Sequence, residues 1–197
     1  MATWYKPGAG TQRATKVKAG DILINTSTFK PAHCGVVVEN FDVIHATNKG
    51  IKKDDIDMWG NEAEMFRAKP GLSKAETDAV IKIATQIMAS AEYGLARAAF
   101  QSTFGSHSAG EGLMSRLEKY RQRLASQEHQ GLVKNVYCSD LVIMTYQLAC
   151  ISGDRVDENN RLFIKLDGKH CWPSTLRSYL KADKANWEFL GEYAPRT

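Results

Sequence analysis

The chain has 197 residues, 43% of them hydrophobic, which suits one domain with a substantial core. Its net charge of +4 is mild, and no stretch combines Lys and Arg with interleaved aromatic side chains, so the composition argues against a nucleic-acid-binding protein. No apolar stretch approaches the roughly 18 residues of a membrane-spanning helix, so we expect no transmembrane segment.

The start of the chain has no hydrophobic region of the kind that defines a secretory signal. We therefore expect a protein that works in the cytoplasm, or that leaves it without a cleaved signal, unless a signal has been removed. The four cysteines form no CxxC pair and lack zinc-ligand spacing, so neither a metal nor another cofactor is predicted. Cys34, Cys138, Cys150 and Cys171 are interpreted as thiols, with a Cys150–Cys171 disulfide as the alternative.

The first part of the chain reads as a series of short strands. A turn and a strand are predicted at 19–26, and a hairpin at 33–47, in which Glu39 to Asp42 supply the turn between two β-branched runs. Two further extended pieces follow, 50–59 and 64–69, and Pro70-Gly71 ends the second. These strands together predict a small antiparallel sheet.

Helices are predicted from residue 73 onward. Ser73 and Glu76 form an S-x-x-E capping box before an apolar stripe at helical spacing. Residues 95–132 are interpreted as an insertion that contains a Ser- and Gly-rich loop, 101–112, and an amphipathic helix, 113–127. The basic side of that helix is either a solvated face or a binding surface. It consists of Arg116, Lys119, Arg121 and Arg123.

The last third begins with VYCSDLVIMTYQLAC, residues 136–150, in which apolar residues recur at steps of three and four after Cys138. A polar loop is expected at 153–161, a short helix at 171–183, and a closing strand at 187–193. Strands and helices that are grouped in this way, in a chain of this length, predict a single α+β domain.

Cys138 stands at the predicted start of a buried helix, with Ser139 and Asp140 as typical first-turn residues. A thiol in that place feels the positive end of the helix dipole, which lowers its pKa and favours the thiolate. A small buried apolar residue is the other interpretation, because free cysteine is among the most buried residue types. A base elsewhere in the chain decides between the two.

Two of the five histidines, His33 and His45, lie on opposite strands of the predicted hairpin. Residues at equal distances from a turn face each other across an antiparallel pair, so the two imidazoles are expected to meet on one face. One imidazole can then hold the other in the tautomer that accepts a proton from a thiol, as nucleophilic catalysis requires. This arrangement favours the catalytic interpretation of Cys138.

The segments GDILI, HCGVVVENFDVIHA and YCSDLV together resemble the circularly permuted branch of the NlpC-type papain-like cysteine peptidases. That branch also includes the lecithin:retinol acyltransferase-like proteins. Unpermuted members carry the Cys helix before the hairpin, whereas here the hairpin comes first. The resemblance implies a papain-like fold over 1–197, in which a small antiparallel sheet packs against the catalytic Cys helix. It does not cover the insertion at 95–132.

The family's pattern, transferred to this sequence, implies that Cys138 is the nucleophile, His33 the general base and His45 the residue that orients the base. Asp21, in the GD turn before the first strand, is a second candidate for the orienting role. For the oxyanion, the backbone N–H of Cys138 is a donor, and Tyr137 is a candidate second wall.

Cys34 departs from the family's pattern, because it occupies the middle position of H-x-G. It follows His33 directly, so its side chain is expected on the opposite face of the strand. We therefore interpret Cys34 as a core residue and not as a second nucleophile.

A thiolate–imidazole pair with an oxyanion site performs acyl transfer. The resemblance implies a peptidase or amidase that cuts the peptide stems of peptidoglycan. Without a signal peptide, such an enzyme is expected to be a toxin of a type six-like secretion machine, held in the bacterial cytoplasm, delivered to a target-cell periplasm and paired with an immunity protein. A lipid acyl hydrolase or acyltransferase, with its basic helix on an anionic membrane, is the first alternative. A non-catalytic binding domain of papain-like shape is the second.

Overall fold

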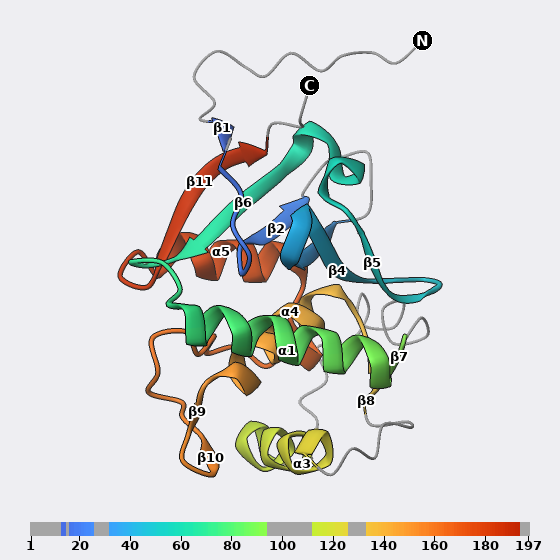
Figure 1. Ribbon diagram of the computed structural model, residues 1–197, viewed down its shortest axis with the longest axis vertical. Helices are drawn as coiled ribbons and strands as arrows, with labels where there is room; N and C mark the ends of the chain where they lie inside the picture. The colour runs from blue at the N-terminus through green and yellow to red at the C-terminus, as the bar shows by residue number, and fades with distance from the viewer. Residues whose placement is uncertain (1–12, 15, 26–31, 94–111, 126–132, 194–197) are drawn as a thin grey trace.

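Seven strands form the main sheet: β1 (Arg13–Ala14), β2 (Ile22–Asn25), β3 (His33–Val37), β4 (Asp42–Thr47), β5 (Gly50–Asp55), β6 (Ala63–Ala68) and β11 (Trp187–Tyr193). They run in the order β1–β11–β6–β2–β3–β4–β5, and all neighbours are antiparallel except β1 and β11 (Figure 1). This computed structural model describes residues 13–14, 16–25, 32–93, 112–125 and 133–193. The chain is an α+β structure, as predicted.

Among the described residues, the helices are α1 (Lys74–Ser90), α3 (Leu113–Ala125), α4 (Cys138–Ala149) and α5 (Pro173–Ala182), with three 3-10 helices, η1 (Glu39–Phe41), η2 (Ile56–Glu62) and η3 (Gly168–His170). Two small ribbons pair β7 (Ala91–Tyr93) with β8 (Val133–Val136) and β9 (Ile151–Ser152) with β10 (Arg155–Val156). The predicted strands and helices are thus confirmed within the described ranges, with one exception. The extended piece predicted at 50–59 ends at Asp55, because Asp55 caps the 3-10 helix η2 that begins at Ile56. The loop predicted at 101–112 lies, apart from residue 112, outside them. None of the described helices combines the length and the apolar character that crossing a bilayer requires.

Side chains of the sheet divide between two apolar clusters. The larger cluster contains Cys34 together with the buried faces of α1, α4 and α5. The smaller contains Leu23, Val37 and Trp59, on the side of the sheet where η2 lies. Helix α4 is buried along almost its whole length and packs against β3 and β4, so its position relative to the sheet is fixed. The place of its first residue, Cys138, is fixed with it.

The hairpin of β3 and β4 has a register that differs from the predicted one. Three residues of η1 fill its turn, and the last of them, Phe41, has a left-handed φ of 65°. A left-handed third residue is typical of three-residue hairpin loops. The ladder consequently pairs Gly35 with His45, so His33 lies diagonal to His45 rather than directly opposite. The predicted direct pairing is wrong by two positions, although the two side chains do share one face.

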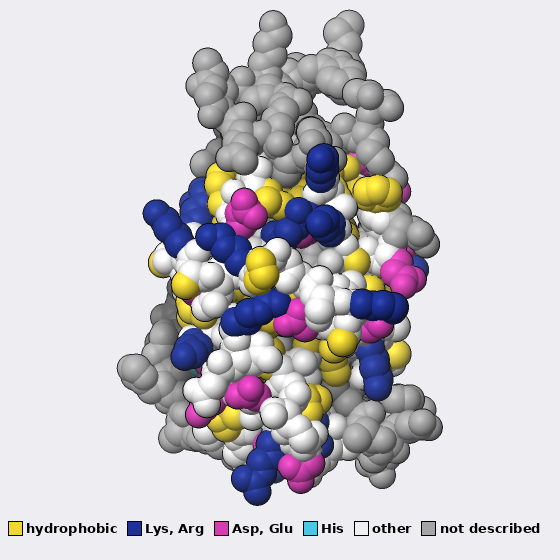
Figure 2. Space-filling model, turned by 60° about the vertical axis from the view of Figure 1, so that its left-hand side comes forward, with side chains coloured by type: hydrophobic (Ala, Val, Ile, Leu, Met, Phe, Trp, Pro, Cys, Tyr) yellow, Lys and Arg dark blue, Asp and Glu magenta, His cyan; other side chains and the backbone are white. Residues whose placement is uncertain are grey.

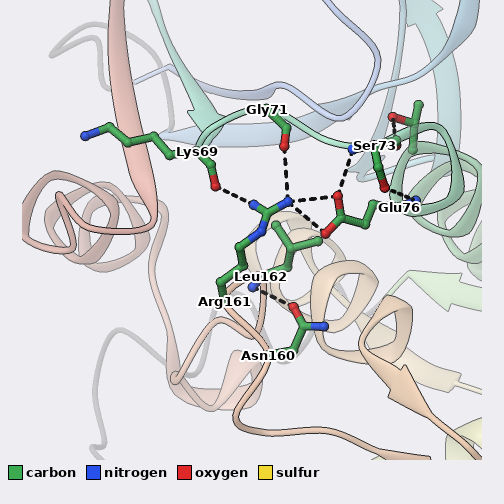
Figure 3. Close-up of polar contacts among 8 residues, drawn as sticks. Lys69, Gly71, Ser73, Glu76, Asn160, Arg161 and Leu162 are labelled. Carbon is green, nitrogen blue, oxygen red and sulfur yellow. Dashed lines mark hydrogen bonds and ion pairs between the residues drawn. The ribbon is translucent and has the colours of Figure 1, made fainter.

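Arg161 ties the segment after α4 to the beginning of α1 (Figure 3). Its guanidinium donates to the carbonyl oxygens of Lys69 (2.5 Å) and Gly71 (3.1 Å) and to both carboxylate oxygens of Glu76 (2.7 and 2.8 Å). Glu76 also accepts from the Ser73 backbone N–H at 2.7 Å, and the Ser73 hydroxyl accepts from the Glu76 N–H at 3.2 Å. The predicted capping box is confirmed, and its carboxylate additionally anchors the chain that follows α4.

The basic side of α3 is partly neutralised within the protein. Arg116 donates to Asp167 at 2.6 Å, and its side chain is only 11% exposed. Arg121 donates to Glu118 on the same helix at 2.7 Å. The side chain of Arg123 and most of the predicted insertion lie outside the described residues. At least two of the four cations are therefore held in ion pairs.

Candidate active site

Cys138 is the first residue of α4, where the chain changes from an extended backbone at Tyr137 (φ −116°, ψ 175°) to helix. The Leu141 N–H donates to the Tyr137 carbonyl at 2.9 Å, so the N–H groups before Leu141 lack an acceptor within the helix. Together with the helix dipole, these groups place partial positive charge beside the sulfur. The predicted position of Cys138 at a helix N-terminus is confirmed.

The surroundings of Cys138 favour its thiolate. The pKa of Cys138 lies well below its ordinary value of 9.0, chiefly because the Cys34 side chain donates a hydrogen bond to the sulfur. Burial opposes this shift, while a hydrogen bond and the charge of His33 and the Cys34 backbone N–H add to it. The pKa of Cys34 is raised well above 9.0, first by burial and then by its hydrogen bond to Cys138. The shared proton of the two thiols therefore stays on Cys34.

His33, His45 and Asp54 form a row across three neighbouring strands. His33 Nε2 lies 2.6 Å from His45 Nδ1, and His45 Nε2 lies 2.9 Å from Asp54 Oδ2. His45 pairs with Gly35 on β3 and with Lys52 on β5, so His33 and Asp54 each lie two residues from the position opposite His45. Diagonal neighbours of this kind lie on the same face and are within reach of long side chains. The sequence interpretation included both histidines but missed Asp54.

Hydrogen-bond directions in this row follow from the carboxylate and from burial. Asp54 can only accept, so His45 Nε2 carries a hydrogen. Burial lowers the pKa of His45 below 6.5, against the opposing effect of Asp54, and the imidazole stays neutral. Its Nδ1 must then accept from His33 Nε2–H, which leaves His33 Nδ1 as the nitrogen available to Cys138. The arrangement is a nucleophile, a base and two orienting groups in series.

Trp59 covers both histidines. Its ring stacks on His33 with centroids 4.9 Å apart and an interplanar angle of 18°, and it lies 5.2 Å from the ring of His45. Trp59 is 7% exposed and belongs to η2, whose start is capped by Asp55 through a 2.8 Å hydrogen bond from the Asp57 N–H. The stacked ring fixes the plane of the His33 imidazole and keeps water from one of its faces. The sequence interpretation gave Trp59 no role, although its place soon after β5 was a usable signal.

Asp21 and Tyr137 have other partners. Asp21 accepts from Arg67 Nε at 2.7 Å, from Arg67 Nη2 at 2.6 Å and from the Lys18 backbone N–H at 2.7 Å. Burial raises the pKa of Asp21, although Arg67 opposes the shift. The Tyr137 hydroxyl donates to the Gly168 carbonyl in η3. The structure therefore brings Asp54, and not Asp21, to the histidine pair.

A concave region lies between α5 and β11, with a volume of about 400 Å³. On the face of the molecule shown in Figure 2, Lys and Arg side chains are interspersed with acidic ones. Lys69 donates to the Lys184 carbonyl at 2.7 Å, and Lys181 donates to Glu64 at 2.9 Å and lies 4.4 Å from the Phe189 ring centroid. This region contains no nucleophile beside a base, so the Cys138 site is the candidate for chemistry.

Among the described residues, no three His, Cys, Asp or Glu side chains are arranged to hold a metal ion. No family model, curated protein or solved structure matches the chain. Its chemistry is therefore inferred from the residues and geometry of the site itself.

Gly35 lies against His45 where β3 and β4 are tightly packed. A Cβ atom at Gly35 would lie 2.6 Å from Val43 Cγ1, 2.9 Å from the Ile44 carbonyl oxygen and 3.0 Å from His45 Cβ. We expect Gly35→Ala to push the strands apart and to lower the free energy of unfolding by about 1–3 kcal/mol. The same displacement should weaken the contact of His45 with His33 and lower the catalytic rate. Thermal unfolding and initial-rate measurements test this.

Gly112→Ala is the matched control, because a Cβ atom there meets nothing within 4 Å. It should leave both the unfolding midpoint and the rate unchanged. If Gly35→Ala behaves in the same way, the packing between β3 and β4 does not constrain the histidine row.

Proposed function

We propose that the protein is a cysteine hydrolase of the circularly permuted papain-like type. The observation that carries the proposal is the series Cys138, His33, His45 and Asp54. Hydrogen bonds join the last three, and His33 lowers the pKa of Cys138 at the N-terminus of a buried helix. A thiolate beside an imidazole that other groups orient is suited to acyl transfer. The strand of His33 precedes the helix of Cys138 in the chain, which agrees with the permuted order that the resemblance implies.

The proposed reaction has two halves. His33 Nδ1 takes the proton of the Cys138 thiol, and the thiolate attacks the carbonyl carbon of the substrate. The carbonyl electrons move to the oxygen, which the backbone N–H groups at the start of α4 stabilise. His33 then gives its Nδ1 proton to the leaving group, and a thioester on Cys138 is left. In the second half, His33 takes a proton from water, the hydroxide attacks the thioester carbon, and the acid product departs from the regenerated thiolate.

We infer that the bond cleaved is an amide in the peptide stems of peptidoglycan, because the resemblance implies this substrate. A toxin delivered to the periplasm of a target cell, with an immunity protein in the producing cell, fits the same proposal. Lipid acyl groups are the alternative substrate. The ion pairs of Arg116 and Arg121 argue against it, since they reduce the charge that α3 could offer an anionic membrane.

Digestion of purified peptidoglycan, followed by mass spectrometry of the muropeptides, tests the proposal. Wild type should release new muropeptides, Cys138→Ala should release none, and both should bind anionic vesicles weakly in co-sedimentation. Tight vesicle binding without new muropeptides would overturn the peptidase proposal in favour of a lipid substrate. No product from either substrate would favour a binding domain.

Asp54→Ala tests the outer end of the histidine row. Without the carboxylate, His45 can place its hydrogen on Nδ1, where it would face the Nε2–H of His33 and disrupt their contact. We expect kcat to fall about tenfold, at the lower end of the usual cost of losing an outer-shell partner of histidine, with KM little changed. Steady-state kinetics on a small ester or amide substrate provide the measurement.

Asp42→Ala is the matched control, because it removes a carboxylate from the same hairpin. Asp42 pairs with Lys53 at 3.2 Å and does not contact the row. Its replacement should leave kcat unchanged. Equal losses in the two variants would mean that overall charge, and not the orientation of His45, sets the rate.

A further inference from the structure

Two cysteines meet at the proposed active site, and only one of them has a role in the hydrolysis. Cys138 packs against the buried cluster that contains Cys34, where α4 contacts β3, and both the thiol and the backbone N–H of Cys34 act to lower the pKa of the Cys138 thiol. Cys138 is partly exposed, whereas Cys34 is fully buried behind it, on the face of β3 that packs against α4. A reagent from solvent therefore reaches Cys138 first, and the product formed on its sulfur lies next to a second thiol.

The other two cysteines are placed differently. Cys171 influences both thiols electrostatically, but its Sγ hydrogen-bonds to the Trp172 carbonyl at 3.5 Å and not to Cys138. Cys150 follows the last residue of α4, at the opposite end of the helix from Cys138. All four are free thiols in this structure, so the cysteine that contacts Cys138 is Cys34.

We propose that Cys138 is a site of reversible oxidation by hydroperoxides and that Cys34 is its resolving cysteine. A disulfide between them stops hydrolysis and protects the nucleophile from further oxidation. This inference rests on the proposed function only in taking Cys138 as the reactive thiol of the site.

The chemistry balances with one hydroperoxide per disulfide. The Cys138 thiolate attacks one oxygen of hydrogen peroxide, the O–O bond breaks, and a sulfenic acid forms as hydroxide leaves and takes up a proton to become water. The Cys34 sulfur then attacks the Cys138 sulfur, the S–O bond breaks, and the Cys34 proton leaves with the hydroxyl group as a second water. The two sulfurs together lose two electrons, and the peroxide gains them. A dithiol reductant reverses the result by thiol–disulfide exchange.

The site favours each of these steps. The lowered pKa of Cys138 keeps the attacking sulfur ionised, and reactivity toward peroxide follows thiolate character and exposure. Cys34 is a poor nucleophile toward solvent reagents because burial raises its pKa. It attacks only after the hydrogen-bonded neighbour has become a sulfenic acid, so the order of events is set by the fold.

Intact-mass spectrometry of the whole protein after treatment with hydrogen peroxide tests the proposal. Wild type should lose the mass of two hydrogen atoms, lose activity, and regain nearly all of it with dithiothreitol. Peptide mapping without reduction should join the peptides of Cys34 and Cys138. Cys34→Ser should instead gain two or three oxygen atoms on Cys138 and recover no activity, since sulfinic and sulfonic acids resist dithiothreitol.

Cys34→Ser is preferred to Cys34→Ala because its hydroxyl can still donate to Cys138, and thermal unfolding shows whether either variant is folded. Cys171→Ala and Cys150→Ala are controls that should oxidise and recover as wild type does. A Cys138–Cys171 disulfide, or reversible inactivation that persists in both Cys34 variants, would overturn the proposal. The mass measurement does not require turnover, so an inactive protein that still forms the Cys34–Cys138 disulfide refutes the hydrolase proposal alone.

Discussion

Cys138→Ala is expected to abolish hydrolysis completely while leaving the protein folded. The sulfur is the atom that attacks the substrate, and no other thiol among the described residues occupies the start of a helix beside His33. Alanine is small and suits the first turn of α4, so the unfolding midpoint should change little. Hydrolysis of a small ester substrate and of peptidoglycan, with circular dichroism for folding, measures the effect.

Alkylation provides the matching control and a pH dependence. Iodoacetamide should label Cys138 before the other three cysteines, and Cys150→Ala and Cys171→Ala should keep most of the activity. The pKa of Cys138 is lowered, so the rate of labelling should decline only at pH values well below 9.0, as the thiolate becomes protonated. In Cys34→Ala the decline should begin at a higher pH, because the largest stabilising contribution to the thiolate is gone. Faster labelling of Cys34 than of Cys138 would contradict the assignment.

His33→Ala is expected to lower kcat by at least about 100-fold, in the usual range for loss of a general base. His33 is the group that links Cys138 to the rest of the row, since its Nε2 is engaged by His45 at 2.6 Å and its other nitrogen is left for the thiol. His45→Ala should cost less, because water can partly replace an orienting group. Steady-state kinetics of the three proteins provide the comparison.

His170→Ala is the control for the histidine series. His170 is exposed in η3, so its loss should leave kcat unchanged. A loss in His45→Ala as large as that in His33→Ala would mean that His45 takes part directly in proton transfer. A silent His33→Ala would refute the proposed base.

Local patterns in the sequence were sufficient for the elements that carry the site. The capping box of Ser73 and Glu76, the helical spacing after Cys138 and the β-branched runs of the hairpin each depend on neighbours within a few residues. Such preferences act along one segment of chain, so they can be read without knowing the fold. For the same reason, the sequence placed a thiol at a helix N-terminus and two histidines on one face of a sheet.

Only the tertiary structure decided which side chains meet. Asp54 reaches His45 because a two-residue turn closes β4 and β5 between Thr47 and Gly50, and that register sets which residue of β5 lies diagonal to the histidine. Asp21 is also an aspartate near a strand, but Arg67, which is distant in sequence, engages both its oxygens. Contacts of this kind depend on register and on packing between elements, which side-chain spacing along one segment does not specify.

For the contact of Cys34 with Cys138 as well, the sequence determined one part and only the tertiary structure decided the other. By itself the sequence determined that Cys34 points away from His33 into the core, because adjacent residues of a strand face opposite sides. It could not determine that the start of α4 lies near the start of β3, where His33 on one face and Cys34 on the other both act on the Cys138 sulfur. That position results from burial of α4 along nearly its whole length against β3 and β4, which is a property of the assembled core and not of either segment.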